Sequence, residues 1–202
     1  RNYIDWTPFF FTWEMRKKYP VILEDEVLGE EARKLLDDAN IMLDNIIKNN
    51  WLQAKAVICV WQANSVGDDV HLSENGKQIA TYNFLRQQGK KTKENRCLAD
   101  FVAPLTSKKQ DYMGSFVCTA GLGIEKQLAV FDKENDDYSS IMLKAIADRL
   151  AEALTEYMHE KIRKEIWGYA ADEQFKNDDL ITEEYKGIRP APGYTACPDH
   201  TE

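Results

Sequence analysis

The sequence of 202 residues lacks the features that mark membrane-spanning and secreted proteins. It has no apolar run near the roughly 20 residues needed to cross a bilayer. Its start shows none of the charged, apolar and small-residue segments of a signal peptide. The 4 cysteines, at positions 59, 97, 118 and 197, show no close pairing, which argues for reduced thiols rather than a disulfide framework. These absences predict a cytoplasmic protein that does not bind membranes.

Positive charge is also scarce. The chain has 26 Lys and Arg against 34 Asp and Glu, a net charge of −8. Because nucleic-acid binding rests on neutralising phosphates, we expect no nucleic-acid partner. The acidic charge does not exclude small cationic ligands. A hydrophobic content of 44% with 11% aromatic residues is typical of a globular domain. Since the chain starts with Arg1, we expect residues 1–202 to be an excised domain, truncated at both ends.

Two long helices are predicted from apolar positions that recur at helical spacing. The first covers residues 29–49, with acids early and Lys48 late, as the helix dipole favours. The second covers residues 136–167 and ends at Gly168. His159 lies in a charged stretch of this helix, and we expect it to be solvated.

Short apolar and β-branched runs predict strands at residues 56–61, 69–73, 78–85 and 111–119. Asn75-Gly76 marks a tight turn between the second and third runs. Together with the helices, this pattern predicts an α+β fold, in which long helices pack around a twisted antiparallel β-sheet, a meander, in a single domain. Asp100 lies in an apolar segment, and we expect it to be buried.

A glycine-containing turn follows the last predicted strand. Gly121-Leu122-Gly123 precedes a helix predicted to begin near Ile124, an order that invites a dinucleotide-binding interpretation. The signal is weak, because only two glycines are present and Lys126 stands where the third should be.

The last fourteen residues form the segment with the most specific pattern. Three prolines between Arg189 and Glu202 exclude both helix and central strand and predict an extended loop. This loop carries the guanidinium of Arg189, the aromatic ring of Tyr194 and backbone carbonyls without predicted partners. These groups suit a small molecule with a carboxylate at one end and a flat base at the other. Cys197, Asp199, His200 and Glu202 have metal-ligand side chains, but without a second cluster we expect no metal site.

Aromatic residues dominate the start of the chain and surround a single carboxylate, Asp5. Two interpretations are open. Asp5 either caps a short helix opened by Thr7 and Pro8, or it contacts a ligand from within an aromatic wall.

Four stretches carry a resemblance to a known family, in order along the chain. They are Tyr3–Phe10, Cys97–Pro104, Ala147–Ala153 and Arg189–Glu202, the last reading Arg189-Pro190-Ala191-Pro192-Gly193-Tyr194 at its start. This pattern resembles the S-adenosylmethionine-binding activation domain of cobalamin-dependent methionine synthase. The domain of that family continues past the position of Glu202 with further ligand contacts, whereas this sequence stops there.

The resemblance implies roles for particular residues. Arg189 would hold the methionine carboxylate and Asp5 a polar group of the ligand, and Tyr194 with the backbone of residues 190–193 would receive the adenosine. The implied ligand-binding set is Asp5, Glu152, Glu183, Arg189, Pro190, Ala191, Gly193 and Tyr194. No residue of this chain is expected to be catalytic.

The resemblance also implies a function shared with other domains. The chain would bind S-adenosylmethionine and present its methyl group for reductive methylation of inactive cob(II)alamin, in an enzyme that methylates homocysteine to methionine. Cobalamin would be held by a neighbouring domain of the same polypeptide, and zinc only by the absent homocysteine domain. Two alternatives remain: a self-contained S-adenosylmethionine-dependent methyltransferase and a non-catalytic interaction domain.

The implied electron donor is flavodoxin or a related flavoprotein reductase. Residues 86–96 carry five positive charges in a net acidic chain. They form either an ordinary solvated loop or a docking patch for such an acidic donor.

Overall fold

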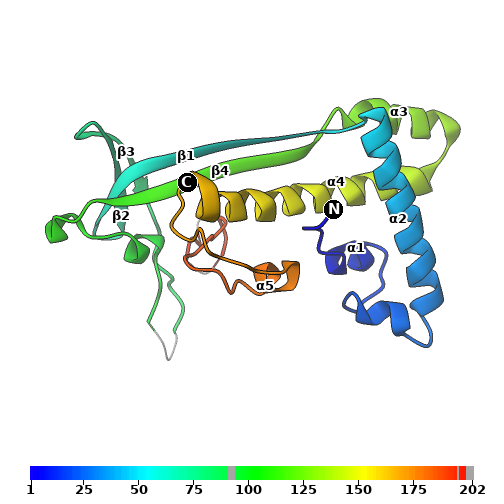
Figure 1. Ribbon diagram of the computed structural model, residues 1–202, viewed down its shortest axis with the longest axis horizontal. Helices are drawn as coiled ribbons and strands as arrows, with labels where there is room; N and C mark the ends of the chain where they lie inside the picture. The colour runs from blue at the N-terminus through cyan, green and yellow to red at the C-terminus, as the bar shows by residue number, and fades with distance from the viewer. Residues whose placement is uncertain (91–93, 195, 199–202) are drawn as a thin grey trace. The chain divides into compact units, whose positions relative to one another are not determined.

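The structure is a computed structural model that describes residues 1–90, 94–194 and 196–198. It divides into two compact units. Unit 1 comprises Arg1–Val57 and Val117–Tyr185, and unit 2 comprises Ile58–Phe116 and Lys186–Glu202. Strands β1 (Gln53–Val66) and β4 (Asp111–Leu122) each pass from one unit into the other, as the cyan and green strands of Figure 1 show.

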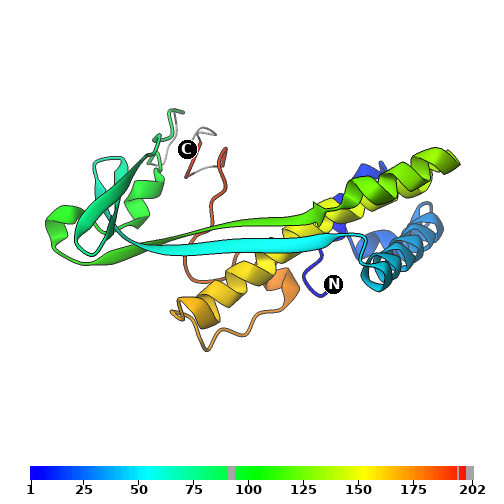
Figure 2. The same ribbon diagram turned by 90° about the horizontal axis from the view of Figure 1, so that it is seen from above.

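Unit 1 is built on the long helix α4 (Asp137–Lys161), whose first turn is capped by the Asp136 carboxylate accepting from the Ser139 N–H. A π-helical turn (Ile162–Ile166) extends it, and Gly168 at φ 76° ends it. The prediction of one helix over 136–167 is therefore confirmed. Helices α1 (Thr7–Thr12), α2 (Gly29–Asn49) and α3 (Ile124–Glu134) all pack against α4; Figure 2 shows α3 and α4 side by side.

The core of unit 1 joins the amino-terminal aromatic residues to these helices. Phe9, Phe10, Leu43 and Leu143 are almost fully buried there. Burying a side chain of this size is worth roughly 1.5–3 kcal/mol, so this layer is a large part of what holds α1 and α2 on α4. It leaves Asp5 at the start of α1, within unit 1.

The sheet has four strands in the order β3-β2-β1-β4. β2 (Asp69–Glu74) pairs antiparallel with β1 and with β3 (Lys77–Asn83), so the predicted meander is confirmed. Asn75 and Gly76 both have positive φ, 52° and 76°, as a type I′ hairpin turn requires. These antiparallel neighbours also argue against the dinucleotide-binding interpretation of the Gly121–Gly123 turn.

Unit 2 has a smaller core that reaches into the carboxyl-terminal segment. Val70, Leu72, Phe84, Cys97 and Cys197 are buried together. Two short 3₁₀ turns, Leu98–Phe101 and Leu105–Ser107, connect β3 to β4. Because Cys197 belongs to this core, the loop that begins at Arg189 is attached to unit 2 at its far end.

The prediction that Asp100 is buried is wrong. Its carboxylate is exposed and accepts hydrogen bonds from the Cys97 N–H at 2.9 Å and from the Arg86 guanidinium at 2.6 and 2.7 Å. Arg86 also binds Asp68 at 2.7 Å. The guanidinium lowers the pKa of Asp100 below its usual value, although partial desolvation opposes this. Asp100 thus ties the loop after β3 to the first 3₁₀ turn.

Candidate functional site

Asp5 lies immediately before α1, which ends at Thr12. Its Oδ1 accepts a hydrogen bond from the Thr7 N–H at 2.9 Å, and the residue is half-buried. This bond satisfies the N–H of the first residue of α1, whereas the N-cap position is Trp6, which makes no side-chain capping bond. The bond to Thr7 does not exclude ligand binding, because an ionised carboxylate has about four acceptor positions and this bond uses one.

Tyr3 attaches the Asp5 segment to α4. Its hydroxyl donates to Glu160 Oε2 at 2.5 Å, and its ring meets Tyr157 edge-on at 5.5 Å between centroids. Burial and the neighbouring Glu160 carboxylate raise the pKa of Tyr3 to about 12. Burial opposes ionisation of Glu160, but hydrogen bonds from Tyr3 and Lys164 outweigh it and lower the pKa of Glu160.

The two other acids of the predicted set are on the surface of unit 1. Glu152 is exposed on α4, and Glu183 is exposed just after α5 (Asn177–Ile181), with φ 60°. Either carboxylate is open to solvent and so available to a cationic ligand. Their roles in binding stay predictions.

The loop beginning at Arg189 is held by backbone hydrogen bonds within unit 2. The Gly193 N–H donates to the Cys197 carbonyl at 2.7 Å, and the Cys197 N–H donates to the Tyr194 carbonyl at 3.0 Å. Gly193 has φ 90°, a conformation that favours glycine. This tight turn presents Tyr194, whose side chain is 69% exposed.

The remaining predicted residues of this loop differ in exposure. Ala191 is exposed, whereas Arg189 and Pro190 are half-buried. The predicted set is divided between the two units: Asp5, Glu152 and Glu183 belong to unit 1, and Arg189, Pro190, Ala191, Gly193 and Tyr194 belong to unit 2. A cleft shared by the two groups stays a prediction.

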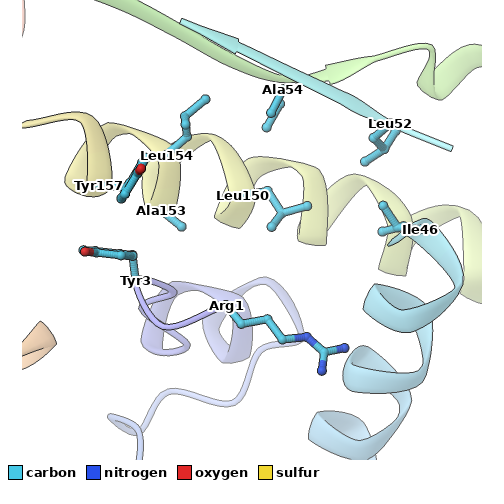
Figure 3. Close-up of a pocket in the computed structure, with 10 residues that line it drawn as sticks. Arg1, Tyr3, Ile46, Leu52, Ala54, Leu150, Ala153, Leu154 and Tyr157 are labelled. Carbon is cyan, nitrogen blue, oxygen red and sulfur yellow. The ribbon is translucent and has the colours of Figure 1, made fainter. Parts of the chain in front are cut away.

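A pocket of ≈ 260 Å³ in unit 1 is lined by none of these eight residues. Figure 3 shows Tyr3 and Tyr157 facing each other in it, with Arg1 extending toward α2, where its guanidinium donates to the Asn40 carbonyl and binds Asp44. The residues of α4 that line the pocket are Leu150, Ala153, Leu154 and Tyr157, which share one helix face. This lining is largely apolar and contains no carboxylate.

Sequence reasoning missed a buried polar cluster, which we call the Arg163 cluster: Arg163, His159, Glu173 and Tyr185. Arg163 is completely buried and pairs with Glu173 at 2.6 Å. The prediction that His159 is solvated is wrong, because its side chain is 5% exposed and lies 2.7 Å from the Arg163 guanidinium. The only sequence signal was the spacing of His159 and Arg163, one helical turn apart.

Metal ligands do not gather in the part of the chain that the structure describes, where no group of three or more His, Cys, Asp or Glu could hold an ion. Asp199, His200 and Glu202 lie outside that part. The cysteines at 59, 97, 118 and 197 are all described, and no disulfide joins any of them. The helices within the described ranges include none with the length and hydropathy of a membrane span.

Comparison with known families places this arrangement in context. A family model described as the activation domain of vitamin B12-dependent methionine synthase matches residues 1–202. The chain belongs to this family. The family match thus extends over both units of the activation domain, and the resemblance seen in its four sequence stretches is confirmed.

A solved structure agrees with this assignment. The activation domain is 52% identical to a protein whose crystal structure is described as the MetH reactivation domain bound to AdoHcy, with a TM-score of 0.94. The match covers 100% of this chain and 63% of that one, so this activation domain spans less than two thirds of the length of that chain. The predicted α+β fold is confirmed by this likeness.

Proposed function

We propose that this chain binds S-adenosylmethionine and presents its methyl group for reactivation of cobalamin in a methionine synthase. The observation that carries the proposal is the match of the whole chain to the activation-domain family. It is supported by 52% identity to a protein described as bound to AdoHcy, the demethylated form of that ligand. The reaction and partners of a whole enzyme are part of the proposal.

The residues fit this ligand in chemical type. Arg189 offers a guanidinium fork for the methionine carboxylate, and Asp5, Glu152 and Glu183 offer negative charge to the ammonium and sulfonium. The exposed ring of Tyr194 and the turn at Gly193, with the backbone of Pro190 and Ala191, offer a surface for the adenosine. Side chains of this kind orient a ligand and stabilise its charge.

Cobalamin, when bound by a neighbouring domain of the same polypeptide, would supply the reduced cobalt that accepts the methyl group. The part of this chain is to hold the sulfonium in place, so we propose that it is not catalytic alone. We also propose a cytoplasmic setting, because four cysteines without a disulfide fit a reducing compartment.

Arg189→Ala tests the ligand site. We expect binding of S-adenosylhomocysteine to weaken roughly tenfold to hundredfold, because a charge-assisted bond to a carboxylate is lost. Titration calorimetry measures this. The control is Arg16→Ala, which removes another guanidinium at an exposed position and should leave the affinity unchanged.

Equal affinity in wild type and Arg189→Ala would remove Arg189 from the site. Absence of binding both in the wild type and in a chain extended beyond Glu202 would contradict the ligand function itself and favour a non-catalytic interaction domain. Methyl transfer by the isolated chain to a small acceptor, without cobalamin protein, would instead support the self-contained methyltransferase.

We further propose that an acidic flavoprotein, flavodoxin or a relative, docks on the basic segment 86–96. The structure reduces the charge available there, because Arg86 is engaged by Asp68 and Asp100. Lys90 and Arg96 are exposed, while Lys91 and Lys93 lie outside the described residues.

Charge reversal at Lys90, Lys91 and Lys93 should weaken flavodoxin binding roughly tenfold at low salt and flatten its salt dependence. Fluorescence titration at two ionic strengths measures both quantities. Reversal of Lys34 and Lys48, which lie on α2 in unit 1, is the control. Unchanged affinity and salt dependence in the segment variant would eliminate this docking site.

A further inference from the structure

In the Arg163 cluster, all three nitrogens of the buried guanidinium have a hydrogen-bond partner. Arg163 Nε donates to Glu173 at 2.9 and 3.1 Å, and Nη2 donates at 2.6 Å. Nη1 lies 2.7 Å from His159 Nδ1. Because a guanidinium only donates, that nitrogen of His159 must be the unprotonated acceptor.

Tyr185 completes the cluster. The Arg163 guanidinium lies over its ring at 4.4 Å from the centroid, and the His159 ring meets it edge-on at 4.7 Å. Tyr185 is 6% exposed, whereas residues 181–184 and 186–188, all of them described, are exposed. Tyr185 is therefore the point at which this stretch is anchored to unit 1.

Fold stability alone is a weak reason for such a cluster. A buried ion pair costs desolvation, and apolar residues of similar volume are often as stable or more so. The cluster also begins in a π-helical turn (Ile162–Ile166), a rare geometry found disproportionately at functional sites. The guanidinium instead contacts three side chains at once in a fixed geometry: it hydrogen-bonds His159 and Glu173 and lies over the ring of Tyr185.

Tyr185 lies a short distance in sequence before the predicted ligand-binding residue Arg189. Arg189 follows four residues later, after Gly187 at φ 99°, and the far end of the loop is anchored by Cys197 in the core of unit 2. The same end of α4 also holds the segment of Asp5, through Tyr3 on Tyr157 and Glu160. One stretch, residues 157–163, thus anchors the chain at two points, Tyr3, two residues before Asp5, and Tyr185, four residues before Arg189.

We propose that Arg163, His159 and Glu173 are positioning residues for ligand binding, acting through Tyr185 on the segment that carries Arg189. This inference rests on the proposed binding of S-adenosylmethionine. Without the anchor, residues 182–188 have more conformations, and the ligand must order them when it binds. The affinity should then fall although no residue that touches the ligand has changed.

The variant Arg163→Met with Glu173→Leu separates positioning from stability. It removes both charges at similar volume, so we expect a much smaller loss of thermal stability than in Arg163→Met alone, which leaves the Glu173 charge buried. The loss that remains comes from His159, whose Nδ1 no longer has its donor. In the double variant we expect S-adenosylhomocysteine to bind roughly tenfold more weakly, and amides of residues 182–194 to exchange faster without ligand.

Unchanged exchange over 182–194, or faster exchange with unchanged affinity, would overturn the proposal. Tyr185→Leu keeps the Arg163–Glu173 pair and gives the same two readouts if the double variant does not fold. Tyr185→Phe, which keeps the ring, should retain most of the affinity. If neither the wild type nor the extended chain binds the ligand, the proposed function fails, while the exchange measurement still decides whether the anchor exists.

Discussion

At the residue scale, one hydroxyl connects the amino-terminal segment to the longest helix. Tyr3 donates to Glu160 at 2.5 Å, and Lys164 binds the same carboxylate at 3.2 Å. The pKa of Glu160 is lowered and that of Tyr3 is raised to about 12. The fold thus favours a neutral Tyr3 beside an ionised Glu160.

Tyr3→Phe should lower the free energy of unfolding by about 1 kcal/mol at pH 7, because Glu160 loses a hydrogen-bond donor. A folded-state pKa above the unfolded value of about 10 gives stability that is complete below pH ~10 and lost as the pH rises toward ~12. The variant should therefore show a shallower alkaline decline. Urea unfolding at pH 7 and across pH 9–11 tests both effects.

Tyr138 provides the comparison for this prediction. Burial and its hydrogen bond to Asp38 also raise its pKa to about 12, so Tyr138→Phe should remove a further part of the alkaline decline. An alkaline slope in Tyr3→Phe identical to that of the wild type would contradict the assigned role of Tyr3.

At the element scale, the start of α2 depends on a close approach of backbone. A Cβ at Gly29 would lie 2.8 Å from the Leu23 carbonyl oxygen, a backbone atom of the preceding 3₁₀ turn (Val21–Glu24). The absence of a side chain at Gly29 therefore lets that turn pack directly on α2.

Gly29→Ala should destabilise the protein by roughly 1–3 kcal/mol, although alanine has the higher helix propensity. The reason is that the turn must move away from α2 to make room. Thermal or urea unfolding measures the change. Gly121→Ala, where no atom lies within 4 Å of the added Cβ, should change stability far less; equal losses in the two variants would refute the steric explanation.

At the scale of the whole molecule, several carboxylates are ionised more readily in the folded chain. Hydrogen bonds from Lys17 and backbone N–H groups lower the pKa of Asp25 to about 2. The pKa values of Glu30, Asp100 and Asp136 are lowered chiefly by hydrogen bonds from Lys34, Arg86 and Ser139. They lie in both units, so acid acts on the entire molecule.

A lowered folded-state pKa gives stability that is present above the unfolded value and lost as the pH falls through the folded value. We therefore expect the contribution of these carboxylates to the free energy of unfolding to be nearly constant from pH 7 to 5 and to decline between about pH 4 and 2. Urea unfolding across this range measures it. Lys17→Met should reduce the decline, and a stability independent of pH below 4 would contradict the prediction.

Both units could be predicted in part from local patterns. Helix α2 has the predicted bounds of 29–49, and the Asn75-Gly76 turn joins strands β2 and β3 as predicted. These signals are encoded within a few residues by periodicity, capping and positive φ. The family and the candidate ligand residues were likewise recognisable, because their motifs are contiguous in sequence.

Only the tertiary structure decided where His159, Arg163 and Asp100 lie. A charged residue on a helix is solvated or buried according to which distant segment covers it, and Glu173 and Tyr185 reach Arg163 from outside α4. The sequence by itself therefore determined the elements and the family of this chain. The burial of the Arg163 cluster, and with it the anchor before Arg189, arises from contacts that no local pattern encodes.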